Sequence, residues 1–441
     1  MTAWLIAGVM FAAASAQAGR VQPPTRIVTV ELDGHVAILA DVVPRQDALE
    51  LRPELRLDLG GRFGADGRVR FGVDVLAQGL SASRAGQTVT AATFRPRDAW
   101  IEVGGRRGDL RAGYGRVIWG RLDEVQPSDV INPIDASKLL LDSRAAARLP
   151  VWFARARVVP SDRITAEAVL LPVFRRGTFD ELDEASSPFN LVRTSGGFAA
   201  AKPATASIAG AVPPGLDVPV ERVEPGNGWA TMSGGGRASI TIGRVDVAAA
   251  VFRGFEPFGV VWLEVLGPGA APPGLVLRER HTRFTMIAGD AETVVGDWAV
   301  RGEAAWFAER MFAGVSRPGL VRGRALDAGV GFDRRAGDLR VFGTVLVRRQ
   351  WSGEDAAVSA TDVSLVGSVE RAFGRDRYRA RAFAVVNPCD AAGFVRGLFS
   401  WSVRDNVTLE ASAAAFLGDG DDLLSRFSGR DFGFTRFIVY F

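Results

Sequence analysis

The sequence predicts an all-β fold, a transmembrane antiparallel up-and-down β-barrel of 18 strands, on three observations. Apolar and polar residues alternate with period two from Leu49 to the terminal Phe441. The alternating segments are about ten residues long, the length that a tilted strand needs to cross a bilayer. Tight turns and long connections alternate along the chain, as they do in barrels with short periplasmic turns and long extracellular loops. A count of 16 strands remains the alternative.

The alternation is strict in residues 49–59, where five leucines share one face and Glu50, Arg52, Glu54, Arg56 and Asp58 share the other. At the end of the chain, Phe437, Val439 and Phe441 share a face. A soluble β-sandwich also alternates, but it needs no uniform strand length and no export signal. The 18 predicted strands are residues 29–39, 49–59, 68–79, 97–105, 109–117, 150–159, 164–174, 234–243, 245–255, 280–289, 295–308, 322–333, 338–350, 360–370, 377–386, 392–403, 406–417 and 431–441.

The first 18 residues predict a cleaved signal peptide, because an apolar stretch ends in Ala16-Gln17-Ala18. The n-region carries no Lys or Arg, which departs from the usual pattern, and a short buried helix is the alternative. Residues 19–441 are then one barrel domain, with long loops at 118–149 and 175–233. No later stretch is apolar enough for a spanning helix.

Composition excludes several functional classes. The 53 basic and 50 acidic residues are interleaved, which argues against a nucleic-acid partner. The single cysteine, Cys389, excludes an intramolecular disulfide, and the two distant histidines, His35 and His281, offer little for a metal site. We therefore expect no cofactor and no metal.

Two motifs carry a resemblance to known proteins. The ending Arg436-Phe437-Ile438-Val439-Tyr440-Phe441 resembles the last strand of Gram-negative outer-membrane barrels of the porin-like kind, in which the final aromatic residue is an assembly signal. The segments 111–120 and 129–135 are similar to the Gly-Arg-x-x-x-Trp-Gly and Asn-Pro stretches of a large proteobacterial barrel family of unassigned function. Members of that family are sometimes encoded beside lipid-exporting transporters.

The resemblance implies residence in the cell outer membrane, contact with its lipids, recognition by the barrel assembly machinery through the C-terminal strand, and an envelope transporter as a further partner. One departure is the scarcity of tyrosine, of which the chain has three. An interfacial aromatic girdle must therefore use Trp and Phe, for example Trp152, Trp262, Trp298, Trp306 and Trp401.

Loop 118–149 is expected to fold into the barrel and narrow it. Asn132-Pro133 and Asp135 predict a turn and a helix cap, and residues 136–148 predict a short helix whose leucines 139–141 need an apolar surface. The alternative is that the loop lies over the rim against loop 175–233. The candidate constriction residues are Trp119, Arg121, Asp123, Glu124, Asp129, Asn132, Asp135, Arg144 and Arg148.

Arginines on the predicted inward faces are numerous, and an unneutralised set would favour anions. In the alternative, Glu50, Glu54, Asp58, Asp74, Glu167, Asp246 and Glu303 neutralise them as cross-strand pairs. The candidate pore-lining residues are Arg52, Arg56, Arg70, Arg155, Arg157, Arg283, Arg301, Arg340, Arg379 and Arg381.

Catalysis is not expected. Ser239 falls on predicted strand 234–243 and His281 at the start of predicted strand 280–289, but no residue is placed to orient the imidazole. Asp123, Glu124, Asp129 and Asp135 lack the spacing of a calcium loop and are expected to be either solvated or paired with arginine. The sequence thus predicts a pore or conduit that passes small anionic or amphipathic solutes across the outer membrane. The alternative is a loop-closed barrel that acts as a binding or structural partner of an envelope export system.

Overall fold

A computed structural model of the chain describes most of the predicted mature domain. The predicted signal peptide 1–18 and most of loop 175–233 lie outside the described residues. Within them, no helix is both long and apolar enough to cross a bilayer. The described residues are 28–43, 48–63, 68–84, 87–135, 144–178, 220–266, 274–314, 319–352, 361–419, 424–428 and 431–441.

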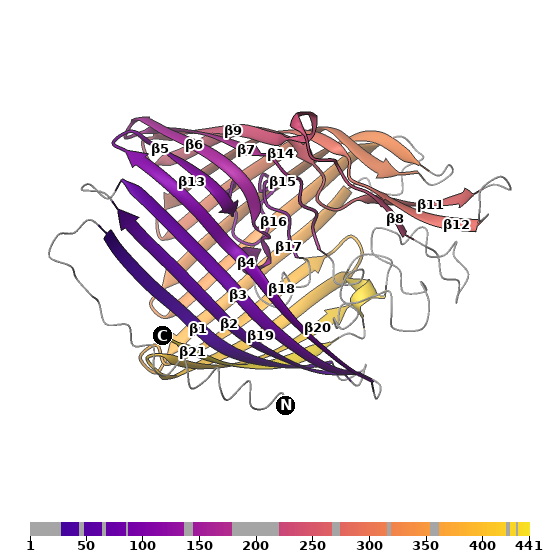
Figure 1. Ribbon diagram of the computed structural model, residues 1–441. Helices are drawn as coiled ribbons and strands as arrows, with labels where there is room; N and C mark the ends of the chain where they lie inside the picture. The colour runs from indigo at the N-terminus through magenta and orange to yellow at the C-terminus, as the bar shows by residue number, and fades with distance from the viewer. Residues whose placement is uncertain are drawn as a thin grey trace.

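The chain forms one closed antiparallel barrel of 18 strands, in which the first strand pairs with the last (Figure 1). The predicted strand count is confirmed, and each predicted segment overlaps one strand of the barrel. The barrel strands are β1 (Val28–Val43), β2 (Ala48–Phe63), β3 (Val69–Arg84), β4 (Gln87–Gly105), β5 (Gly108–Gly115), β6 (Val151–Ser161), β7 (Ile164–Leu171), β9 (Ser233–Ile242), β10 (Val245–Phe255), β13 (Arg283–Val295), β14 (Trp298–Ala313), β15 (Leu320–Ala336), β16 (Leu339–Ser352), β17 (Thr361–Phe373), β18 (Tyr378–Asn387), β19 (Ala392–Arg404), β20 (Val407–Leu417) and β21 (Phe432–Tyr440).

A second sheet of three short strands extends beyond the barrel, where the sequence predicted irregular loops (Figure 1). It consists of β8 (Val220–Val223), β11 (Val260–Leu266) and β12 (Gly274–Arg280), with β12 antiparallel to β11 and parallel to β8. These strands have four to seven residues. They were missed because segments this short show too few alternations for a period to be recognised.

The register assigns each barrel residue to one of two faces, because directly paired residues on neighbouring strands point the same way. Outward positions carry exposed apolar side chains, such as Val30, Leu110 and Val330, each more than half exposed. Inward positions carry buried charges such as Asp74 and Glu303. A closed barrel with an apolar outer wall satisfies its backbone groups internally and spans a membrane.

The rim at which the chain ends carries the tight turns, which marks it as periplasmic. Several of these turns have two residues, and Gly243 and Gly337 occupy them with φ of 63° and 59°, a left-handed conformation that glycine adopts without strain. The opposite, extracellular rim carries the long connections. The predicted alternation of lengths is incomplete, since connections 44–47, 85–86 and 388–391 on the extracellular rim are also short.

Four of the five tryptophans predicted for the aromatic girdle, Trp152, Trp298, Trp306 and Trp401, lie on outward faces of barrel strands. The expectation for Trp262 is wrong, because this residue belongs to β11 in the extra sheet. Trp298 packs edge-on against Phe332 near the periplasmic rim, and Trp306 packs against Trp351 toward the extracellular rim. Aromatic pairs therefore mark both edges of the apolar band.

Candidate channel constriction

Residues 116–135, which we call the inner loop, enter the barrel after β5 and reach strands far around its wall. The backbone N–H of Arg121 donates to Glu303 on β14 at 2.9 Å. Asp123 accepts a hydrogen bond from Arg301 on β14 at 2.7 Å, and Glu124 accepts one from Arg381 on β18 at 2.9 Å. All three wall residues lie on inward faces. The inner loop therefore crosses the lumen.

Apolar side chains attach the inner loop to the wall at two places. Trp119 is 1% exposed, packs edge-on against Phe252 of β10, and donates its indole N–H to Glu167 at 2.7 Å. Leu122 is equally buried and packs against Phe342 and other apolar residues of β16 and β17. Full burial of one such side chain stabilises by about 1.5–3 kcal/mol. These contacts explain why the loop lies inside rather than over the rim.

One wall carboxylate, Glu303, binds both arms of the loop tip. It accepts the backbone N–H groups of Arg121, Leu122 and Ser128 at 2.9, 3.2 and 2.7 Å, and the Ser128 hydroxyl at 2.7 Å. Gly120 has a φ of 94°, and a Cβ there would lie 2.7 Å from a Glu303 oxygen. A side chain at position 120 would collide with the Glu303 carboxylate, so glycine allows this close contact.

The neck of the loop is closed by Asn132 and Asp129. The Asn132 side chain accepts the Val117 N–H at 2.9 Å and donates to the Leu149 carbonyl at 2.8 Å. The fully buried Asp129 carboxylate binds Arg148 at 2.7 Å and Arg144 at 3.3 Å. These bonds join the returning segment to the entering one, so the inner loop is a folded unit.

All nine predicted constriction residues belong to this region. Arg121 binds Asp290 at 2.6 Å and Glu292 at 2.9 Å, and the buried Asp135 donates its N–H to the Ala147 carbonyl at 2.7 Å. Asp123, Glu124 and Asp129 are paired with arginine, which is one of the two alternatives expected for the loop acids. Among the described residues, no cluster suited to a metal ion occurs.

The predicted helix 136–148 is seen as a single short turn, α3 (Arg144–Ala147), and residues 136–143 lie outside the described residues. The leucines that the sequence argument relied on are among them. The described packing is made instead by Trp119 and Leu122. Sequence analysis did not single out Leu122 because its partners are more than two hundred residues away in the chain.

Nine of the ten candidate pore-lining arginines lie on inward faces, and the expectation for Arg283 is wrong. Arg283 pairs with Phe255 on the outward face, and its guanidinium donates to the Ala230 and Met232 carbonyls at 2.7 Å. The strand begins at Arg283, and the burial of Phe284 and Met286 determines which face points inward. The error arose because alternation near a strand end does not reveal where the strand begins.

Most of the inward arginines are paired with carboxylates across strands, as the alternative interpretation held. Asp74 binds Arg56 through both oxygens, at 3.0 and 2.7 Å, and Asp109 binds both Arg155 and Arg157. Glu303 differs from that interpretation, since it binds the inner loop. Further pairs are Arg70–Glu102, Arg301–Glu292, Arg340–Asp333 and Arg379–Glu370.

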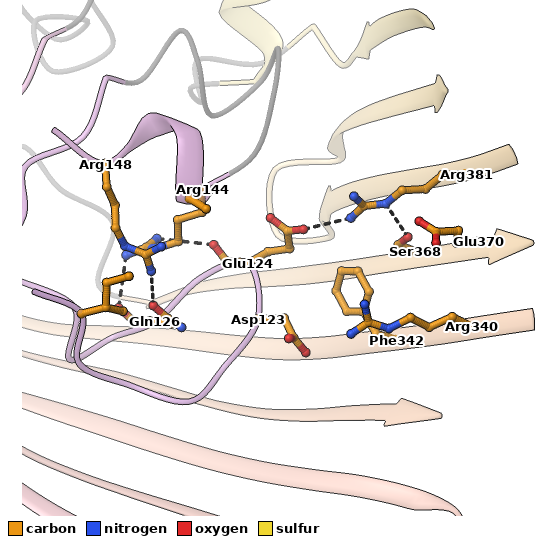
Figure 2. Close-up of a pocket in the computed structure, with 12 residues that line it drawn as sticks. Asp123, Glu124, Gln126, Arg144, Arg148, Arg340, Phe342, Ser368, Glu370 and Arg381 are labelled. Carbon is orange, nitrogen blue, oxygen red and sulfur yellow. Dashed lines mark hydrogen bonds and ion pairs between the residues drawn. The ribbon is translucent and has the colours of Figure 1, made fainter. Parts of the chain in front are cut away.

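A cavity of about 350 Å³ lies between the inner loop and strands β16–β18 (Figure 2). Loop acids and wall arginines line it together, and Figure 2 shows Arg381 reaching both Glu124 and Ser368. Phe342 and the exposed Ile118 add an apolar patch. Burial raises the pKa of the Asp123 carboxyl above its usual value, and Arg301 opposes this shift. The lining therefore combines charges of both signs with apolar groups.

The closed 18-strand barrel, its apolar outer wall and its two unequal rims define a β-barrel of the outer-membrane kind. No protein-family model and no curated protein sequence matches the chain. Solved outer-membrane proteins share the general fold. The chain is similar to OpdK of Pseudomonas aeruginosa, with 11% identity, a TM-score of 0.49, and coverage of 93% of this chain and 98% of that one.

Two further similar structures are OccK7 (OpdD) of the same organism and OmpF of Salmonella typhi in complex with daunomycin. OccK7 is 10% identical over 94% of this chain and 98% of its own, with a TM-score of 0.47. OmpF is 9% identical over the same shares, with a TM-score of 0.43. Likeness at this level concerns the fold alone.

Proposed function

We propose that the protein is a diffusion pore for small solutes, in which the inner loop forms the narrowest section. The observation that carries this proposal is the pair of contacts from loop to wall, Asp123 to Arg301 and Glu124 to Arg381. They bring a folded, charged segment across the lumen, where it reduces the open area. A solute must then pass between loop and wall.

We further propose that the preferred solutes are small amphipathic molecules that carry both charges, and that preference for anions is weak. The wall arginines are largely neutralised by carboxylates, which lowers the net field that would select anions. Acids on the loop still face arginines on the wall, so a passing solute meets opposite charges on its two sides. Phe342 and Ile118 offer a contact for an apolar group.

Single-channel recording in planar bilayers tests the pore. Replacing the loop tip, residues 120–128, by a short flexible linker should raise the conductance several-fold over the unaltered protein. Glu303→Gln, which keeps the side-chain shape and weakens four hydrogen bonds to the loop, should increase current fluctuations with little change in mean conductance. Glu370→Gln on β17 is the matched control, since its contact with Arg379 is 3.5 Å long.

The second candidate is a loop-closed barrel that partners an envelope export system. The burial of Trp119 and Leu122 on separate wall clusters favours it, because a loop attached at two places can close a lumen. Absence of current from the unaltered protein and from the loop-tip variant would overturn the pore and support the partner role. Recognition of the C-terminal strand by the assembly machinery remains a prediction under either function.

The positions of Ser239 and His281 do not support an enzymatic role. Ser239 pairs with Ala248 on β10, and Ala248 pairs in turn with Asp290 on β13. His281 precedes Asp290 by nine residues. At about 3.3 Å per residue the two side chains are far beyond hydrogen-bonding distance. The buried His281 ring instead bonds the Glu256 carbonyl at 2.9 Å, and burial lowers its pKa.

A further inference from the structure

The outward face of the barrel carries a localised basic cluster. In the described barrel strands, outward-facing charged residues are absent from the middle of the wall and gather at its ends. Those at the extracellular end lie on five consecutive strands of the wall, whereas the others, among them Arg334 and Arg371, lie at the periplasmic ends. The extracellular group is Arg253, Arg283, Glu309, Arg322, Arg324 and Arg349.

The depth of this group can be derived from β15. Its outward residues from Arg324 to Arg334 enclose an apolar run of Leu326, Ala328, Val330 and Phe332. Ten residue steps of about 3.3 Å on a strand tilted by about 40° span roughly 25 Å, the height of the apolar band of a membrane barrel. Arg334 and Arg324 therefore lie at opposite edges of the hydrocarbon, at the level of the lipid headgroups.

The two edges differ in how their arginines are neutralised. At the periplasmic edge, Arg334 binds Asp297 at 3.0 Å. At the extracellular edge, Arg322, Arg324 and Arg349 form no ion pair with any described residue. Arg349 donates to the Thr361 hydroxyl and lies over the Trp351 ring at 5.9 Å.

The three arginines are neighbours on the same face. Arg324 pairs directly with Trp351, and Arg349 lies two residues from that tryptophan on β16. Diagonal neighbours of this kind, such as Arg324 and Arg349, are about 7–8 Å apart. Alternate residues of one strand, such as Arg322 and Arg324, are about 6.6 Å apart. Three long guanidinium side chains can therefore converge on one small group.

We propose that Arg322, Arg324 and Arg349, flanked by Trp351, bind the phosphate of an anionic lipid headgroup in the outer leaflet. The planar guanidinium donates paired hydrogen bonds to phosphate oxygens, and arginine near a membrane surface attracts anionic lipid. The tryptophan ring anchors the same position at the interface. A second copy of this chain is a poorer occupant, because Glu309 is the one carboxylate on the described outward face of β13–β16.

Native mass spectrometry of the full-length barrel tests this assignment with phosphatidylglycerol as the probe and phosphatidylcholine as the neutral comparison. The variant Arg322→Gln/Arg324→Gln/Arg349→Gln should lose roughly a hundredfold in phosphatidylglycerol affinity, about fivefold for each arginine. The corresponding Lys variant should retain part of the affinity, since it keeps the charge without the paired hydrogen bonds. Arg371→Gln, at the other rim, should bind like the unaltered protein.

Four outcomes would overturn the lipid site. Equal phosphatidylglycerol affinity in the Gln variant would show that the arginines do not bind the lipid. Equal affinity of the unaltered protein for phosphatidylcholine would show that the net negative charge of the lipid is not recognised. Displacement of the lipid by millimolar inorganic phosphate would assign the cluster to free anion. An oligomer that the Gln variant dissociates would assign it to a second copy. Resistance of each variant to unfolding in neutral detergent confirms that the barrel has formed.

Discussion

Arg348 and Arg349 are adjacent in β16 and face opposite environments. Arg348 points into the lumen and binds Asp327 of β15 at 2.9 Å, whereas Arg349 points outward and has no carboxylate partner among the described residues. The same contrast holds for the two faces generally. Inside, the barrel supplies the counter-charge from its own strands. Outside, at the extracellular edge, it leaves the counter-charge to the surroundings.

The difference follows from the source of counter-charge that is present at each face of the barrel. The lumen holds water and solutes whose charge varies, so a wide lumen lined with unpaired arginine would repel cations and attract every anion. Cross-strand acids remove most of that field. The lipid face at headgroup level meets fixed anionic groups, and an arginine there is satisfied by the membrane.

The largest effect is expected from removing a buried lumen carboxylate. Asp74 is 3% exposed at its side chain, binds Arg56 through both oxygens, and lies 3.5 Å from Arg97 and 3.7 Å from Arg116. Asp74→Asn leaves several guanidiniums without their shared counter-charge. The free energy of unfolding should fall by about 3 kcal/mol, measured by urea titration of the barrel in vesicles.

The matched control for that experiment is Asp58→Asn. Asp58 is about half exposed and lies 3.9 Å from the same Arg56, so its removal should change stability by less than about 1 kcal/mol. A loss as large as that of Asp74→Asn would mean that general lumen charge, rather than buried pairing, determines stability.

The next prediction compares the two adjacent arginines directly. Arg348→Gln leaves Asp327 with one remaining contact, to Arg310 at 3.7 Å, and should shift the reversal potential of the channel toward cations. Arg349→Gln should leave the reversal potential unchanged, because its side chain faces lipid. Reversal potentials in a salt gradient measure both. An equal shift in the two variants would contradict the assignment of faces.

The architecture was predictable because it depends on local alternation. Strands such as residues 49–59 reveal their two faces in any window of ten residues, and all 18 barrel strands were found this way. Faces near strand ends were less predictable, as Arg283 shows, because a few residues of alternation do not determine where pairing begins. Irregular register at Asp74/Val75 and at Phe307/Arg310 has no local signal either.

The site was predictable in its residues and not in its mechanism of attachment. Trp119, Arg121 and Asp129 were singled out because they belong to loop 118–149, whose leucines were expected to bring it into the barrel. The contact between Glu303 and the loop could not be inferred, because Glu303 is separated from Arg121 by 182 residues. No local sequence pattern in either segment indicates that the two meet. Contacts between distant segments arise only when the barrel closes, and alternation within one strand does not predict them.

The smallest predicted effect concerns the pH dependence of selectivity and rests on Asp123. Burial raises the pKa of this carboxyl, so on acidification it takes up a proton before an ordinary exposed aspartate does. Protonation removes a negative charge opposite Arg301, whose other carboxylate contact among the described residues is to Glu292 at 3.0 Å. The balance of charge at the constriction then becomes more positive. Anion preference should therefore increase as the pH falls toward the raised pKa.

The sign of the stability effect follows from the same shift. A carboxyl whose pKa is higher in the folded than in the unfolded protein opposes folding when it is ionised, and this opposition is relieved as the pH falls through the folded-state pKa. Asp123→Asn should thus remove the pH dependence of the reversal potential without lowering stability at neutral pH. If selectivity in the Asn variant still changes with pH as in the unaltered protein, the titrating group lies elsewhere in the lumen. The paired charges of the wall, rather than the inner loop, would then determine the ion selectivity.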